Sequence, residues 1–107
     1  MICRIWHGRT PHHKADDYAR FLAERAIPDY RGVGGNLGVL VLRREQDDVT
    51  HFLTVTLWQS EDAIRAFAGD RVLQARYYDE DREFLLEFEP EVQHFQVGAT
   101  AGFLTGN

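Results

Sequence analysis

The chain of 107 residues contains one cysteine and one lysine, and its acidic residues outnumber its basic ones. One cysteine cannot form an internal disulfide or a zinc site built from several thiolates. A net charge of −5 excludes the basic patch with which proteins bind nucleic-acid phosphates, and it disfavours anionic membrane surfaces. No apolar run reaches the roughly 18 residues of a membrane-spanning helix, and the N-terminus does not resemble a signal peptide. We therefore expect a cytoplasmic protein with no nucleic-acid or membrane partner.

The sequence has the composition of one folded domain. Hydrophobic residues make up 44% of the chain and charged residues 27%, which is typical of a globular protein and not of a disordered one. The length leaves no room for a second domain. We expect a domain over residues 1–97, followed by a small and polar tail over residues 98–107.

Hydrophobic patterning predicts four strands and three helices in this domain. The expected strands are 2–8, 37–44, 49–58 and 92–97, and the expected helices are 11–26, 60–69 and 70–78. Pro28 should end the first helix, while Ser60 should cap the second and Gly69 should end it. The acidic run 79–83 is interpreted as a solvated surface.

The order of these elements predicts how they assemble. Strand, helix, strand, strand, helix, strand is typical of an α+β, ferredoxin-like, split β-α-β domain with a four-stranded antiparallel sheet. Strand 49–58 is apolar or weakly polar on both faces, so the face away from the helices needs a cover. A second copy of the same sheet is the simplest cover. We expect a homodimer, a dimeric α+β barrel, with a ligand pocket between the helices and the sheet.

Several side chains could carry chemistry. If His7 faces the helices, as we expect, it could act as a general base; a histidine with a structural partner is the alternative. Trp58 could stack on a flat aromatic ligand or fill the core. The phenol groups of Tyr30, Tyr77 and Tyr78 could bind the polar edge of that ligand or lie at an interface. The histidines lack the spacing of a metal site, so none is expected.

Five motifs carry a resemblance to a known family. They are IWHGRT at 5–10, PDY at 28–30, NLGV at 36–39, LWQSEDAIRAF at 57–67 and EPEV at 89–92. Through them, residues 1–97 resemble the antibiotic biosynthesis monooxygenase superfamily of dimeric α+β barrels. This superfamily includes cofactor-independent quinone-forming monooxygenases and heme-degrading monooxygenases. The resemblance implies the same fold and a homodimer.

The resemblance also implies an activity. Heme-degrading members use an asparagine, a tryptophan and a heme-ligating histidine where an ungapped alignment places His7, Phe67 and Tyr77. All three residues differ. The chain is more similar to the quinone-forming members, which hold a phenol with Trp, Tyr, Asn and Arg side chains and need no metal or flavin.

We therefore expect a monooxygenase that oxidises a small phenolic or polyketide-like aromatic substrate without a bound cofactor. The expected catalytic residues are His7, Trp58 and Tyr77, and the expected substrate-binding residues are Tyr30, Asn36, Phe67 and Tyr78. One alternative is a non-catalytic domain that binds a small ligand. The other is a heme-binding or heme-degrading protein, because tyrosine can also ligate ferric heme.

Overall fold

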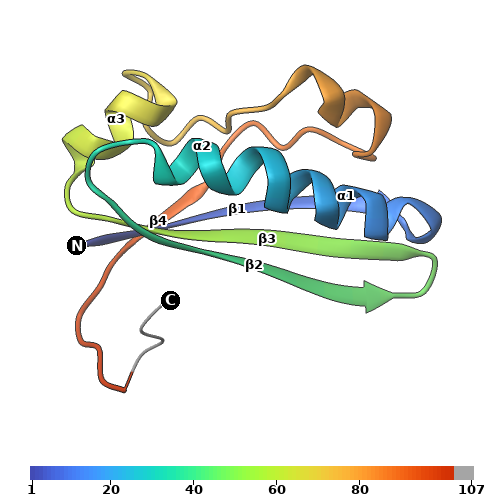
Figure 1. The fold of residues 1–107 in the computed structure, drawn as a ribbon, viewed down its shortest axis with the longest axis horizontal. Helices are drawn as coiled ribbons and strands as arrows, with labels where there is room; N and C mark the ends of the chain where they lie inside the picture. Colours follow the sequence, from blue (N-terminus) through green and yellow to red (C-terminus); the bar gives the residue numbers. More distant parts are fainter. Residues whose placement is uncertain (103–107) are drawn as a thin grey trace.

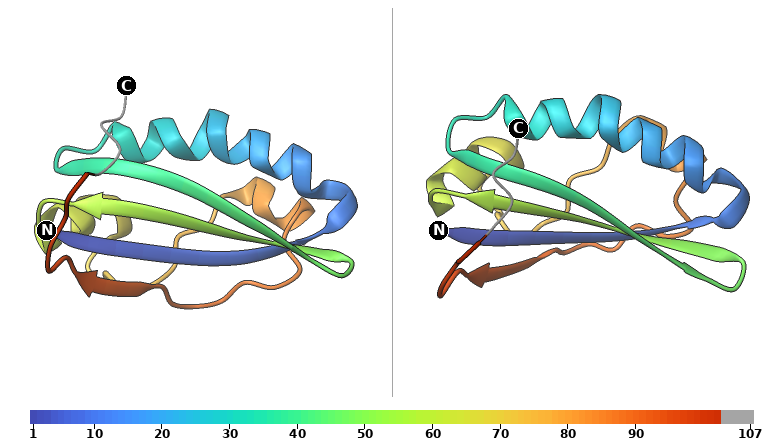
Figure 2. Two further views of the ribbon diagram at one scale, coloured as in Figure 1. Left: turned by 90° about the horizontal axis from the view of Figure 1, so that it is seen from below. Right: turned by 60° about the horizontal axis from the view of Figure 1, so that its bottom comes forward.

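Four antiparallel strands form one sheet in the order β2-β3-β1-β4 in the computed structural model, which describes residues 1–102 (Figure 1). The strands are β1 (Ile2–Pro11), β2 (Asn36–Gln46), β3 (Val49–Trp58) and β4 (Gln93–Gln96). The helices cover one face of the sheet only (Figure 2). No helix in the described part of the chain is long and apolar enough to cross a membrane. The predicted ferredoxin-like α+β fold is confirmed, whereas the predicted tail falls partly on residues 103–107, outside the described residues.

One helical segment connects β1 to β2 and continues past the proline at which it was expected to end. Its parts are η1 (His12–Lys14), α1 (Ala15–Phe21), the π-helix η2 (Leu22–Ala26) and α2 (Ile27–Arg31). The N–H of Ile27 donates to the carbonyl of Leu22, five residues back, so the hydrogen-bond pattern shifts by one just before Pro28. Pro28 then lies in the first turn of α2, where its missing N–H is not needed. The prediction that Pro28 ends the helix is wrong.

Residues 70–78 form no helix, contrary to the prediction. Gly69 ends α3 (Glu61–Ala68) with a φ of 91°, as expected. The chain then runs beside the segment before β4. The N–H of Ala75 donates to the carbonyl of Pro90 at 2.9 Å, and the N–H of Val92 donates to the carbonyl of Leu73 at 2.8 Å. These long-range bonds satisfy the backbone in an extended form and replace the bonds of a helix.

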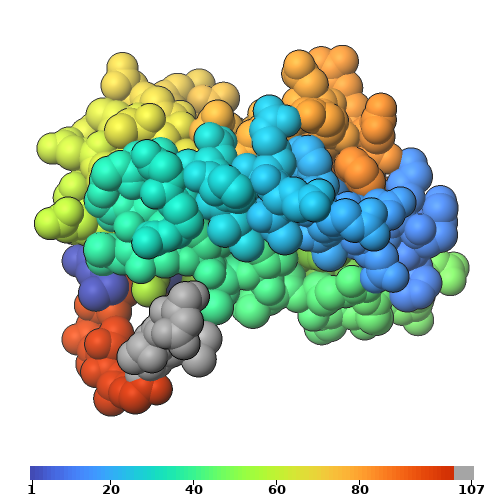
Figure 3. Space-filling model, viewed as in Figure 1, coloured from blue at the N-terminus to red at the C-terminus, as the bar shows by residue number. Residues whose placement is uncertain are grey.

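The acidic run forms the short 3-10 helix η3 (Asp79–Glu83), and one of its carboxylates is buried. Asp81 is 2% exposed and accepts from Tyr18 Oη at 2.9 Å and from the N–H of Tyr78 at 2.7 Å. Burial raises the pKa of the Asp81 carboxyl. The prediction of a solvated surface is therefore wrong at this residue, which attaches η3 to α1. In the space-filling view, η3 and α3 stand as two separate lobes above the α1–α2 segment (Figure 3).

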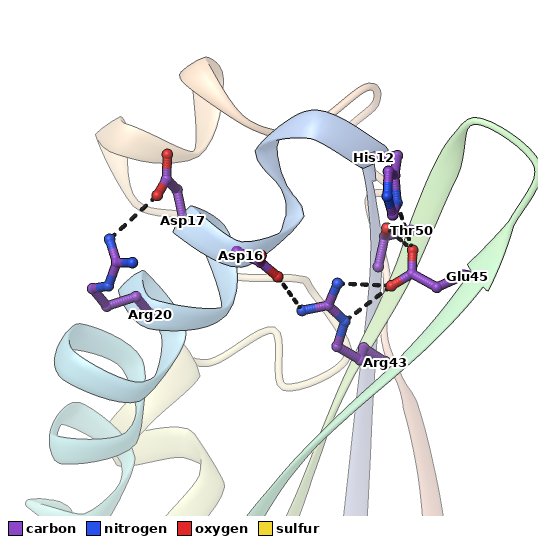
Figure 4. A network of polar contacts seen from close by, with 7 residues as sticks. All are labelled: His12, Asp16, Asp17, Arg20, Arg43, Glu45 and Thr50. Carbon is purple, nitrogen blue, oxygen red and sulfur yellow. Dashed lines mark hydrogen bonds and ion pairs between the residues drawn. The ribbon is translucent and has the colours of Figure 1, made fainter.

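A polar network ties the start of the helical segment to the β2–β3 hairpin (Figure 4). Glu45 accepts from Thr50 at 2.5 Å, from Arg43 at 2.7 Å and from His12 at 2.9 Å. Arg43 also donates to Asp16 of α1 at 3.0 Å. The bond from Thr50 and the bonds from Arg43 lower the pKa of Glu45 to about 2. The network fixes the end of the sheet that lies farthest from α3.

The N-cap of α3 gives a first testable prediction. Ser60 Oγ accepts from the N–H of Ala63 at 3.2 Å, as the sequence predicted. Replacing Ser60 with alanine leaves that N–H without its acceptor and should lower the free energy of unfolding by about 1 kcal/mol, measured in urea by tryptophan fluorescence. Ser60→Asp keeps an acceptor and should remain close to the wild type. An alanine variant with an unchanged midpoint would contradict the capping role.

The two faces of the sheet differ sharply. Towards the helices, β1 and β3 present buried side chains such as Trp6, Phe52 and Trp58. Away from the helices, the register brings together half-buried or exposed apolar side chains, which we call the outer face: Cys3, Ile5, Leu40, Leu42, Leu53, Val55, Leu57 and Phe95. Leu42 is 44% exposed and Phe95 51% exposed. The outer face thus leaves a continuous apolar surface in contact with water.

Candidate functional site

His7 lies on the outer face and not under the helices, so the expected orientation is wrong. β1 alternates strictly, with Arg4, Trp6 and Gly8 buried and the residues between them half-buried. The reason is the fit of Trp6 to Gly8. A Cβ on Gly8 would lie 2.5 Å from the indole of Trp6, so the indole fills the space that a side chain there would need. Because successive side chains of a strand point to opposite faces, the inward position of Trp6 places His7 on the outer face.

His7 belongs to a line of polar contacts at one end of the outer face. Its Nδ1 lies 2.5 Å from Glu89 Oε2, and its Nε2 lies 2.9 Å from His51 Nδ1. His51 Nε2 lies 2.7 Å from Gln46 Oε1. Both ring nitrogens of each histidine thus have a partner. His7 is therefore occupied by structural partners, and the arrangement does not offer it to a ligand under the helices.

Trp58 and Asn36 are also held by the fold. Trp58 is completely buried, and its Nε1 donates to Thr56 Oγ1 at 2.8 Å, so its ring fills the core and offers no free face. Asn36 Nδ2 donates to the carbonyl of Leu57 at 3.3 Å, and its Oδ1 accepts from Arg31 at 2.9 Å. These bonds hold the irregular start of β2 against β3.

The two tyrosines after α3 have partners for their hydroxyl groups. Tyr77 Oη donates to the carbonyl of Glu89 at 2.6 Å, and its ring meets the edge of Trp6 with the centroids 6.2 Å apart. Tyr78 Oη donates to Asp29 Oδ2 at 2.6 Å. Burial, together with Asp29, raises the pKa of Tyr78. Both phenols therefore remain neutral donors at physiological pH.

The structure brings together a group of rings and cations that we call the inner cluster: Arg4, Tyr30, Phe67 and Arg76. Phe67 stacks on Tyr30 with the ring centroids 4.7 Å apart. The guanidinium carbons of Arg76 and Arg4 lie over the Phe67 ring at 4.6 and 5.9 Å. Tyr30 is buried, with its Oη 3.1 Å from Thr54 Oγ1. Two of the expected ligand-contacting residues, Tyr30 and Phe67, thus lie side by side.

Sequence reasoning missed both arginines of the inner cluster. Arg4 is 2% exposed, and burial lowers the pKa of its guanidinium. Side chains alternate along a strand, so Arg4 lies on the same side of β1 as Trp6, and this alternation could have revealed that Arg4 is buried. Arg76 carried no such signal, because its segment was expected to be helical. Within the described residues, no group of three or more His, Cys, Asp or Glu side chains lies so as to hold a metal ion.

Comparison with known proteins finds the same fold in solved structures. MhuD, a heme-degrader from Mycobacterium tuberculosis with two hemes in its active site, is 20% identical, with a TM-score of 0.65 over 95% of this chain and 100% of that chain. A MhuD mutant with two manganese protoporphyrin IX molecules per active site is 18% identical, with a TM-score of 0.66 over 96% and 100%. A candidate antibiotic biosynthesis monooxygenase from Bacillus cereus is 13% identical, with a TM-score of 0.59 over 94% and 97%. No protein-family model and no curated protein matches the chain.

These similarities bear on two expectations. The predicted resemblance to the antibiotic biosynthesis monooxygenase superfamily is confirmed at the level of the fold. The expectation of a protein without a bound cofactor is wrong, because solved structures with the same fold hold heme or manganese protoporphyrin IX. The differences at His7, Phe67 and Tyr77 are not a sufficient ground for excluding a cofactor.

The residues of this chain nevertheless do not fit a porphyrin between the α1–α2 segment and the sheet. That layer is filled by side chains that are at most 1% exposed: Tyr18, Phe52, Trp58 and Ile64. Tyr77 Oη donates to a backbone carbonyl, and His94 Nε2 lies 3.0 Å from Arg4 Nη1. Neither side chain presents a free ligand atom to an iron in this arrangement, which therefore supports no reaction step through heme.

Proposed function

We propose that this protein is a homodimeric, monooxygenase-like enzyme whose substrate is a small, flat aromatic molecule. The observation that carries this proposal is the inner cluster, in which Phe67 stacks on Tyr30 and lies beneath the guanidinium of Arg76, which is half-exposed and pairs with Asp29 Oδ2 at 3.2 Å. Aromatic rings beside a cation bind a phenol by stacking and its phenolate by charge. The fold shared with a candidate monooxygenase supports the same class of activity.

The chemistry follows from the position of the cation. A guanidinium close to a bound phenol stabilises the phenolate and lowers the pKa of the phenol. The phenolate is richer in electrons than the phenol and reacts more readily with dioxygen. The reaction balances as phenol plus dioxygen giving quinone plus water. One oxygen atom enters the ring, the ring gives up two hydrogens, and the second oxygen atom leaves as water.

The homodimer rests on the outer face. Its apolar side chains come from all four strands, and they lie on the side of the sheet that no helix covers. A surface of this kind on a small domain favours association, and two identical faces are complementary when related by a two-fold axis. The polar line from Glu89 to Gln46 lies at one end of this face.

Oxygen uptake tests the enzymatic part of the proposal. With 1-naphthol and related phenols as substrates, we expect one molecule of dioxygen consumed for each quinone formed, measured with an oxygen electrode and by quinone absorbance. Arg76→Gln removes the cation from the inner cluster and should slow the reaction by about tenfold or more. Arg71→Gln, which changes an exposed arginine outside the cluster, should keep the wild-type rate.

Three outcomes would contradict the proposal. Binding of naphthols without any oxygen uptake would instead favour a ligand-binding domain. Stoichiometric hemin binding with a shifted Soret band would favour the heme degradation that MhuD performs. Equal rates for Arg76→Gln and Arg71→Gln would remove the inner cluster from the reaction.

A further inference from the structure

We infer that Arg4 and His94 form an anion-binding site at the edge of the sheet, which takes the carboxylate or phenolate group of a small aromatic ligand. The site shares Arg4 with the inner cluster, because Arg4 lies over the Phe67 ring and its Nη1 lies 3.0 Å from His94 Nε2. This inference rests on the proposed function only in taking the ligand to be the aromatic substrate.

Arg4 is a buried cation without a carboxylate partner among the described residues. Its guanidinium donates to the carbonyls of Val72 and Gln74 and to His94, all of which are neutral. A buried charge is normally paired, because burial removes the water that would stabilise it. Because Arg4 is 2% exposed, an anion from outside the chain would meet this positive charge through His94 and not by direct contact.

His94 connects that charge to a groove. Arg4 can only donate, so His94 Nε2 accepts and the ring hydrogen is on Nδ1. Burial and the neighbouring Arg4 lower the pKa of His94, which keeps its ring neutral at physiological pH. No described residue accepts from His94 Nδ1. The ring thus keeps one N–H donor, polarised by a buried cation behind it.

The groove beside His94 fits the apolar body of a ligand. It has a volume of about 520 Å³ and is lined by Val72, Leu73 and Val92, by Gln93, and by Phe95, which also belongs to the outer face. Glu61 also lines it, and its carboxylate bonds to Arg65 at 3.3 Å, which offsets part of its charge. Apolar walls beside the polarised His94 donor favour a flat aromatic ring that carries one anionic group, rather than a multiply charged phosphate.

Binding of a matched pair of probes tests the site. We expect naphthalene-2-carboxylate to bind the full-length protein about tenfold or more tightly than the neutral naphthalene-2-carboxamide, measured by calorimetry. Arg4→Gln should remove this preference for the anion and leave the binding of the amide nearly unchanged, whereas Arg4→Lys should keep part of the preference. Arg44→Gln, an exposed arginine on the opposite face of the sheet, is the control and should bind as the wild type does.

A second variant covers the case in which Arg4→Gln does not fold. His94→Leu removes the donor at the groove, leaves the guanidinium in place and should also abolish the preference for the anion. Equal binding of the two probes by the wild type, or an unchanged preference in His94→Leu, would overturn the inference. Because neither probe carries a phenol, this result is independent of whether the protein consumes oxygen.

Discussion

Val55→Asp is expected to convert the proposed homodimer into monomers that remain folded. Val55 lies in the middle of the outer face, opposite Ile5 on one neighbouring strand and Leu40 on the other. In a dimer, the new carboxylate would be buried against apolar side chains of the second copy without a partner, which costs several kcal/mol. Since each 1.4 kcal/mol or so changes an equilibrium constant tenfold, the dissociation constant should rise by about a thousandfold.

Sedimentation at micromolar concentration measures this change. In the monomer, position 55 is half-exposed, so the aspartate can reach water and the fold should lose only about 1 kcal/mol from lower strand propensity. Ala23→Asp adds the same charge on the exposed side of the helical segment and should leave the dimer intact. A wild-type protein that sediments as a monomer, or a Val55→Asp dimer of unchanged affinity, would show that a second copy does not cover the outer face.

Trp58→Ala is expected to remove a large part of the stability of the domain. The indole is completely buried on the helical side of the sheet, where it meets Tyr30 of α2 and Phe67 of α3 with ring centroids 6.4 and 5.7 Å away. Truncating a buried tryptophan to alanine typically costs about 3–5 kcal/mol, against a total of about 5–15 kcal/mol for a domain of this size. Urea unfolding followed by circular dichroism should show a large fall in the midpoint.

Two further variants separate packing from the hydrogen bond of the indole. Trp58→Phe keeps an aromatic ring but loses the bond to Thr56, so it should cost about 1–2 kcal/mol. Leu86→Ala removes a side chain that is 48% exposed and should change stability by about 0.5 kcal/mol or less. If Trp58→Ala unfolded at the wild-type midpoint, the indole would not be the core residue that its burial indicates.

The four strands and their succession along the chain could be predicted from the sequence, because the signals of a strand are local. β3 lies at the predicted residues, and Ser60 caps α3 as expected. The failures have long-range causes. Residues 70–78 have helix-forming residue types, but their carbonyls accept from Arg4 and their backbone pairs with residues 90–92, which are far away along the chain. No sequence pattern within residues 70–78 reveals these contacts with distant residues.

The candidate site was predicted less well than the fold, and the reason is again physical. Alternation along β1 correctly separates two sets of residues, but it does not say which set faces the helices. Which set faces the helices follows from the contact of Trp6 with Gly8. This contact depends on the volume of the indole and not on the polarity of the residues. Polarity pointed to His7 as the functional residue, whereas the buried charge on the helical side belongs to Arg4.

The π-helix η2 sets the angular phase of everything that follows it along the helical segment. An α-helix advances about 100° per residue, so twelve residues of it would rotate Tyr30 about 120° away from the direction of Tyr18. The wider turn takes up part of this excess, and both tyrosines are buried against the sheet. With one residue fewer in 22–26, a regular α-helix would make eleven steps, about 1100°, and would bring Tyr30 to within about 20° of the direction of Tyr18. The π-helix thus lets the segment hold one more residue while Tyr30 still faces the sheet and stacks on Phe67.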